Sequence, residues 1–113
     1  QRQMCIRDSY YAMTAELDSR LDEAAANPYL VSTLRTLRLH LARLRRLAAD
    51  DPARLAASAA EHADIADAVG SGAADLAEAT TRVHLHHAFH HLTRRGRAEE
   101  TPTLLTPTEG DRP

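Results

Sequence analysis

The sequence predicts an all-α fold, an antiparallel helical bundle of about four helices with a disordered C-terminal tail. Alanine and leucine dominate the 113 residues, with 22 Ala and 15 Leu against three Val, which is typical of helices rather than strands. Aromatic residues make up only 4% and Trp is absent, which excludes a core built on a sheet. The length suits one domain, because a single core commonly serves about 100–150 residues.

Residues 1–9 differ in character from the rest of the chain. Residues 4–9, Met-Cys-Ile-Arg-Asp-Ser, resemble one translated frame of the transposon-end sequence used in sequencing libraries. We therefore expect residues 1–9 to be a sequencing or cloning scar and the natural protein to be truncated at about Tyr10. Cys5, the only cysteine, then lies in the scar, so no disulfide or thiol chemistry is expected.

Two helices are predicted in the first half of the chain. The first spans residues 10–26, and residues at helical spacing mark its inward face: Tyr11, Thr14, Asp18, Leu21 and Ala25. Asn27 and Pro28 form a cap-then-proline signal that starts the second helix, residues 28–49. Apolar residues at alternating steps of four and three form a seam for a neighbouring helix or a second subunit: Leu30, Leu34, Leu37, Leu41, Leu44 and Ala48.

Two more helices follow, joined by short connections that favour antiparallel neighbours. Asp51 and Pro52 repeat the cap-then-proline signal. The inward face of this third helix, which runs to Val69, is expected to hold Leu55, Ala59, His62, Ile65, Ala66 and Val69. The fourth helix spans residues 73–95, and Gly96 is expected to stop it. Residues 97–113, rich in Pro, Thr and Glu, are predicted to be a disordered tail, which leaves residues 10–96 as the folded domain.

Charge and hydropathy exclude several classes of protein. The 14 basic residues are all Arg and face 16 acidic residues, for a net charge of −2, so the chain alone offers no positive field for nucleic acid. It contains neither a run of about 18 apolar residues nor a signal-peptide pattern. We therefore expect a cytoplasmic protein with no membrane partner.

Three polar residues fall on the inward faces of three different helices. His62 lies among apolar positions, Asp18 lies at the centre of the first helix's inward face, and His84 lies on the small-residue face of the fourth helix. A buried imidazole or carboxylate needs a partner. If these groups converge, they make a metal site that suits Zn, Ni or Mn and keeps coordination positions open. A buried Asp–His hydrogen bond without a metal is the alternative.

Five of the seven histidines lie within residues 84–91. Helical geometry places His84, His87 and His91 on one face, whereas His86 and His90 point away and are expected on the surface. His87 or His91 is a candidate for a fourth metal ligand. A solvated, His-rich helix end is the alternative interpretation of the cluster.

The order of Asp18, His62 and His84 along the chain, together with the residues around them, resembles that of the FCD domain, the C-terminal effector-binding domain of FadR-type regulators in the GntR family. Residues 17–30, Leu-Asp-Ser-Arg-Leu-Asp-Glu-Ala-Ala-Ala-Asn-Pro-Tyr-Leu, are similar to that domain's segment FH..L..AAGNPYL. Residues 61–69 are similar to its EH..I..AI segment. His84-Leu85 is similar to its final HL, with His84 placed 22 residues after His62.

This resemblance implies a helical, homodimeric domain that senses a small organic acid beside a divalent metal. In the family one Asp and three His bind the metal; His62 and His84 match two of these histidines, whereas Asp18 stands where His is usual and Thr14 where Asp is usual. It also implies an N-terminal winged helix-turn-helix for DNA binding and opening helices of the domain. We expect both to be missing here, so that the bundle is incomplete.

The leading functional hypothesis is therefore a sensing and dimerisation domain rather than an enzyme. Arg35, Arg38 and Arg45 flank the leucine seam and are candidates to meet an effector carboxylate, the alternative being that they are solvated. A metal-assisted hydrolase is a second hypothesis, although no convincing nucleophile is present. The third is a plain helical interaction module in which the histidines bind nothing.

Overall fold

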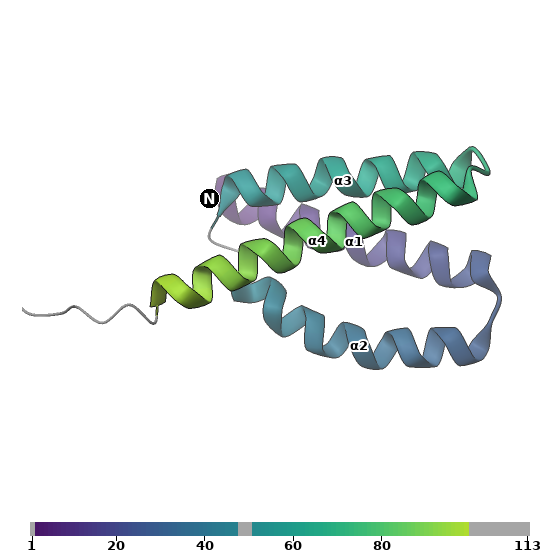
Figure 1. Ribbon diagram of the computed structural model, residues 1–113, viewed down its shortest axis with the longest axis horizontal. Coiled ribbons are helices and arrows are strands. Elements are labelled where there is room, and N and C mark those ends of the chain that lie inside the picture. The colour runs from purple at the N-terminus through teal and green to yellow at the C-terminus, as the bar shows by residue number, and fades with distance from the viewer. Residues whose placement is uncertain (1, 48–50, 100–113) are drawn as a thin grey trace, which may run out of the picture.

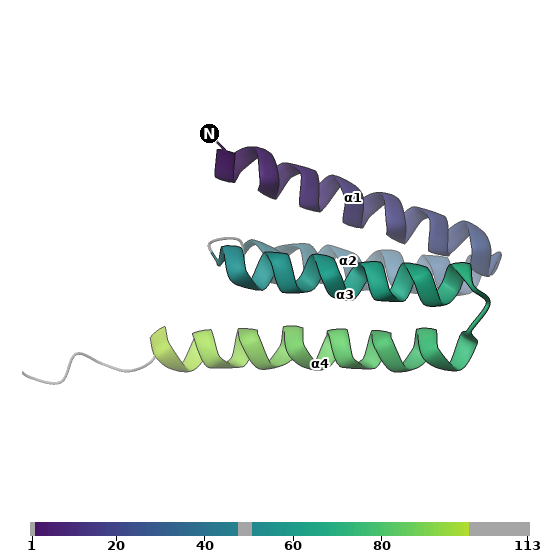
Figure 2. The same cartoon turned by 90° about the horizontal axis from the view of Figure 1, so that it is seen from above.

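The computed structural model describes residues 2–47 and 51–99, and its elements are four helices. These are α1 (Arg2–Ala25), α2 (Pro28–Leu47), α3 (Pro52–Gly70) and α4 (Ala74–Glu99). Successive helices run in opposite directions; α3 lies between α1 and α4, and α2 lies at the opposite edge of the bundle from α3 (Figure 1, Figure 2). The predicted all-α antiparallel bundle is confirmed.

The helix starts follow the capping signals in the sequence. The Asn27 side chain accepts hydrogen bonds from the backbone N–H groups two and three residues further on, both at 3.1 Å. Asp51 caps α3 in the same way at 3.1 Å, and Pro52 takes the first helical position. Between α3 and α4 the chain reverses through Gly72, whose φ of 74° lies in the left-handed region that glycine adopts freely.

Two helix ends differ from the prediction. α1 begins at Arg2 rather than near Tyr10, because residues 2–9 contain neither Pro nor Gly and so extend the helix at little cost. α4 continues through Gly96 to Glu99, because one glycine costs only about 1 kcal/mol relative to Ala and is flanked by good helix formers. The expected stop at Gly96 was therefore wrong, and the rest of the predicted tail, residues 100–113, lies outside the described residues.

The tightest packing lies along α3. Among the described residues, Ser58, Ile65 and Ala68 of α3 and Thr14 of α1 are buried. Of the six residues predicted to face inward, Ile65 is buried and Leu55, His62 and Ala66 are partly buried, whereas Ala59 and Val69 are exposed. The reason is that α3 packs against both α1 and α4, which centres its buried stripe between the two neighbours.

The leucine seam of α2 remains largely uncovered within this chain. Four of its side chains keep between 37% and 51% of their surface exposed: Leu30, Leu37, Leu41 and Leu44. Ala48 lies outside the described residues. Polar contacts link α2 to α1: the Arg38 guanidinium donates two hydrogen bonds to Asp22, and the Tyr11 hydroxyl donates to the Arg45 carbonyl at 3.0 Å. None of the described helices combines the length and apolarity needed to cross a membrane.

Candidate functional site

His62 projects from α3 into the bundle, where it is half-buried. Its Nδ1 lies 2.7 Å from the Ser58 carbonyl oxygen; since a carbonyl only accepts, Nδ1 carries the proton and Nε2 keeps its lone pair. Burial lowers the pKa of His62, and the positive charge of Arg45 and the neighbouring His84 lower it further. The imidazole is thus held neutral, with Nε2 ready to accept a proton or bind a ligand.

His84 of α4 lies directly beside His62. The two ring centroids are 4.3 Å apart, with an angle of 61° between the planes. His84 Nδ1 lies 2.6 Å from Glu61 Oε2, so this nitrogen donates to the carboxylate. Two of the three predicted site residues are therefore brought together, and both use Nδ1 for an anchoring hydrogen bond, as metal-binding and catalytic imidazoles commonly do.

Glu61 anchors this arrangement, although no role for it was predicted from the sequence. Arg54 lies seven residues, or about two turns, earlier on α3 and donates two hydrogen bonds to the Glu61 carboxylate, at 3.2 and 3.0 Å. His84 and His87 donate from α4, each at 2.6 Å. Burial alone would raise the pKa of Glu61, but the bonds from Arg54, His84 and His87 outweigh it and lower the pKa to about 2. The spacing of Arg54 and Glu61, seven residues on one helix face, was the available signal.

Asp18, the third predicted ligand, has a different partner. Its Oδ2 lies 3.5 Å from Arg38 Nε, in the same cluster as Asp22. Thr14 donates its hydroxyl to the Tyr10 carbonyl at 2.8 Å. In the part of the chain that the structure describes, no three His, Cys, Asp or Glu side chains form a group able to hold a metal ion. The two imidazoles thus lie together while the carboxylate is engaged elsewhere, and metal binding stays a prediction.

The remaining histidines of α4 fall into two groups. His87 is held by Glu61, and His91 Nδ1 lies 3.8 Å from Asp51 Oδ2. His91 Nε2 is buried and has no hydrogen-bond partner among the described residues. His86 and His90 are exposed, as the sequence predicted.

A small interior cavity of about 100 Å³ lies between the four helices. Leucines of α2, α3 and α4 line it, together with polar side chains from all four helices: Tyr10, Tyr11, Arg45, Arg54, Ser58, His62, His84 and His91. Arg45 is half-buried, and no described residue forms an ion pair with its guanidinium. The Arg54 guanidinium is paired with Glu61. Among the described residues, Arg45 therefore contributes an uncompensated positive charge next to three imidazoles and two phenol groups, which suits a small anion.

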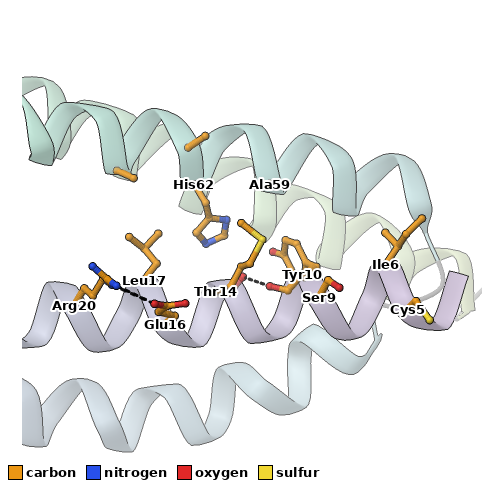
Figure 3. Close-up of a pocket in the computed structure, with 13 residues that line it drawn as sticks. Cys5, Ile6, Ser9, Tyr10, Thr14, Glu16, Leu17, Arg20, Ala59 and His62 are labelled. Atoms are coloured by element: carbon orange, nitrogen blue, oxygen red, sulfur yellow. Dashed lines mark hydrogen bonds and ion pairs between the residues drawn. The ribbon is translucent and has the colours of Figure 1, made fainter. Parts of the chain in front are cut away.

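A larger, mainly apolar groove of about 620 Å³ opens between α1 and α3. Met13 and Leu17 line it from α1, and Ala59 and Ala63 line it from α3. Figure 3 shows the His62 ring pointing from α3 toward α1, and this ring borders the groove and the interior cavity alike.

Comparison with known protein families finds the FCD domain, whose model matches residues 2–87. The match covers most of the described chain, including the positions of His62 and His84. It begins inside the segment that we expect to be a scar, and that expectation stays a prediction. Comparisons with curated proteins and with solved structures found no match.

Proposed function

The chain belongs to the FCD domain family, the effector-binding domain of GntR-family regulators, and on that premise we propose that a small organic acid is its effector. The acid binds in the interior cavity, with its carboxylate on Arg45 and its other polar groups on His62 and His84. The FCD domain belongs to transcription regulators, which are typically not enzymes. We therefore assign Arg45, His62 and His84 to effector binding rather than to catalysis.

The guanidinium of Arg45, which forms no ion pair with a described residue, carries this proposal. A guanidinium matches a carboxylate with two parallel hydrogen bonds, and a partly buried one gains most from such a partner. The other two arginines considered from the sequence are less suitable. Arg38 already donates two bonds to Asp22, at 2.6 and 2.9 Å, and Arg35 is exposed and does not line the cavity.

Effector binding at this place would change how α2 packs. Arg45 belongs to α2, whose leucines are only partly covered, whereas His62 and His84 belong to the closely packed α3 and α4. An acid held between them favours the arrangement in which α2 lies closer to the other helices. In a complete regulator this shift would re-aim the N-terminal winged helix-turn-helix domains, through which DNA is bound.

A homodimer is part of the same proposal. The exposed leucines of α2 form an apolar face, and a second copy of the chain is the partner that we expect to cover it. If the dimer forms through α2, a shift of this helix in one subunit would also change its packing against the other subunit.

A divalent metal such as Zn, Ni or Mn would bind to Nε2 of His62 and His84 and would add Lewis-acid contact to the effector's carboxylate. Asp18 could join such a site only if its carboxylate moved away from the Arg38 guanidinium, which now lies 3.5 Å from it. The proposal therefore assigns recognition of the carboxylate to Arg45 and makes no step depend on a metal.

The test is a thermal-shift and calorimetric screen of small mono- and dicarboxylates against the chain. We expect at least one acid to raise the melting temperature, and Arg45→Gln to weaken its binding by about tenfold or more, which corresponds to one lost charged contact. Arg35→Gln, an exposed arginine on the same helix, is the matched control and should bind as before. Equal affinity in the Arg45 variant, or no stabilising acid in the screen, contradicts the proposal and favours a plain helical interaction module.

A further inference from the structure

We propose that α4 carries a second metal site, on the surface, in which His86 and His90 together bind one divalent transition-metal ion such as Zn²⁺ or Ni²⁺. These two residues take no part in the interior cavity. Their role is therefore independent of the effector proposed above.

The geometry of the pair supports chelation. Residues four positions apart lie one above the other on a helix face, and the same spacing lets two histidines of one helix share a zinc ion in metalloproteases. Here the ring centroids are 6.4 Å apart and the planes are nearly parallel, at 11°. A small change in the side-chain torsions is enough to bring one nitrogen of each ring to an ion at about 2.0–2.1 Å.

Both rings are also available for a ligand. His86 and His90 are exposed, and no described residue forms a hydrogen bond with either ring. A metal ion would therefore displace only water from them. Neutral imidazole is a preferred ligand of Zn²⁺ and Ni²⁺, and water molecules would fill the other coordination positions.

A second pair with the same spacing on α4 shows what makes His86 and His90 distinct. His87 and His91 are also four residues apart, but Glu61 holds His87 Nδ1 at 2.6 Å, and His91 is half-buried near Asp51. Using them would require breaking existing contacts. The exposed pair binds without that cost.

Neighbouring charges set the strength of the site. Arg82, one turn before His86, is paired with Glu78 at 2.9 Å. Arg94, one turn after His90, forms no ion pair with a described residue, so its positive charge weakens the binding of a cation nearby. We therefore expect a modest affinity that depends on both histidines at once.

The experiment is a Zn²⁺ titration of the full chain, prepared without an affinity tag, followed by NMR of the ¹⁵N-labelled histidine rings. At about pH 7.5 ordinary imidazoles are neutral. We expect the His86 and His90 signals to shift together and to saturate with one ion. His86→Ala should reduce the Zn²⁺ affinity at His90 by about tenfold or more, whereas His40→Ala, which removes a single exposed histidine on α2, should leave it unchanged.

Two results would overturn the inference: unchanged Zn²⁺ affinity at His90 in the His86→Ala variant, or a response of His40 at the same Zn²⁺ concentration as His90. Circular dichroism confirms that the variants remain helical, as expected for exposed positions. The signals of His62 and His84 report separately on an interior metal, so the two metal predictions succeed or fail independently.

Discussion

The α3–α4 pair and helix α2 are attached to the bundle in different ways. α3 and α4 are joined by a three-residue connection, Ser71–Ala73, and α3 contributes buried Ile65 and Ala68, at 7% and 2% exposure. The Glu61 carboxylate ties the two helices further through His84 and His87. In α2, by contrast, Leu37 and its neighbours stay largely exposed.

The difference shows that hydrophobicity alone does not decide which helix is packed. The small side chains of α3 and α4 allow a close approach of the helices, so that few large residues suffice to exclude water. The larger leucines of α2 need a complementary surface that the described part of the chain does not supply. We infer that α3 and α4 form the stable frame of the domain and that α2 is the element most easily repositioned.

The strongest test of this contrast compares one large-to-small substitution in each region. Ile65→Ala removes a buried side chain and should lower the free energy of unfolding by about 3 kcal/mol, within the usual range for core isoleucines. Leu37→Ala, at 51% exposure, should cost less than about 1 kcal/mol because most of the side chain stays in water. Urea denaturation of the monomeric chain measures both values. Equal losses would show that α2 is packed as tightly as α3.

A second test removes the charge that joins α3 to α4. Glu61→Gln leaves Arg54 without its anionic partner and weakens the bonds from His84 and His87, so we expect a loss of about 2 kcal/mol in urea denaturation.

Glu16→Gln is the matched control for this substitution. Glu16 forms an exposed pair with Arg20 four residues away, at 3.0 Å and 65% side-chain exposure, so its loss should stay within about 0.5 kcal/mol. If the two variants are equally stable, the Glu61 cluster does not hold the helices together.

The fold could be predicted largely from the sequence because its signals are local. Asn27 and Asp51 cap the helices that they were expected to cap, and Gly72 lies between the predicted end of the third helix at Val69 and the predicted start of the fourth at residue 73. Local signals also explain the error at Gly96, where the glycine was expected to stop the helix although the residues on both sides of it are good helix formers. The exposure of Ala59 and Val69 depends instead on how α3 packs against two neighbouring helices, which spacing within one helix does not reveal.

The candidate site could be predicted only in part for a similar reason. His62 and His84 were identified by their inward positions and by the family pattern, and they do lie together. Asp18 was expected to join them, but the position of the Arg38 side chain, which reaches it from α2, depends on tertiary packing. Glu61 was missed because its partners His84 and His87 come from another helix.

A third test concerns the attachment of α2 itself. Asp22→Asn removes the charge that accepts two hydrogen bonds from Arg38, so α2 should open more often while α3 and α4 stay closed. Hydrogen exchange should become severalfold faster in α2 only, and overall stability should change less than in the Glu61 variant. Glu23→Gln, at an exposed neighbouring position, should exchange like the original chain. Faster exchange throughout all four helices would contradict a separate motion of α2.

The smallest expected effect is the pH dependence that His62 contributes. Burial, with His84 and Arg45 nearby, lowers its pKa from the ordinary 6.5, although the hydrogen bond to the Ser58 carbonyl and the charge of Asp18 act in the opposite direction. Because the folded-state pKa is the lower one, the unfolded chain binds the proton more readily. The contribution of His62 to stability is therefore present above pH 6.5 and is lost as the pH falls through the lowered pKa. NMR titration should give a lower midpoint for His62 in the folded chain than in urea; identical midpoints would mean that the imidazole is solvated, and that the cavity beside it is open to water.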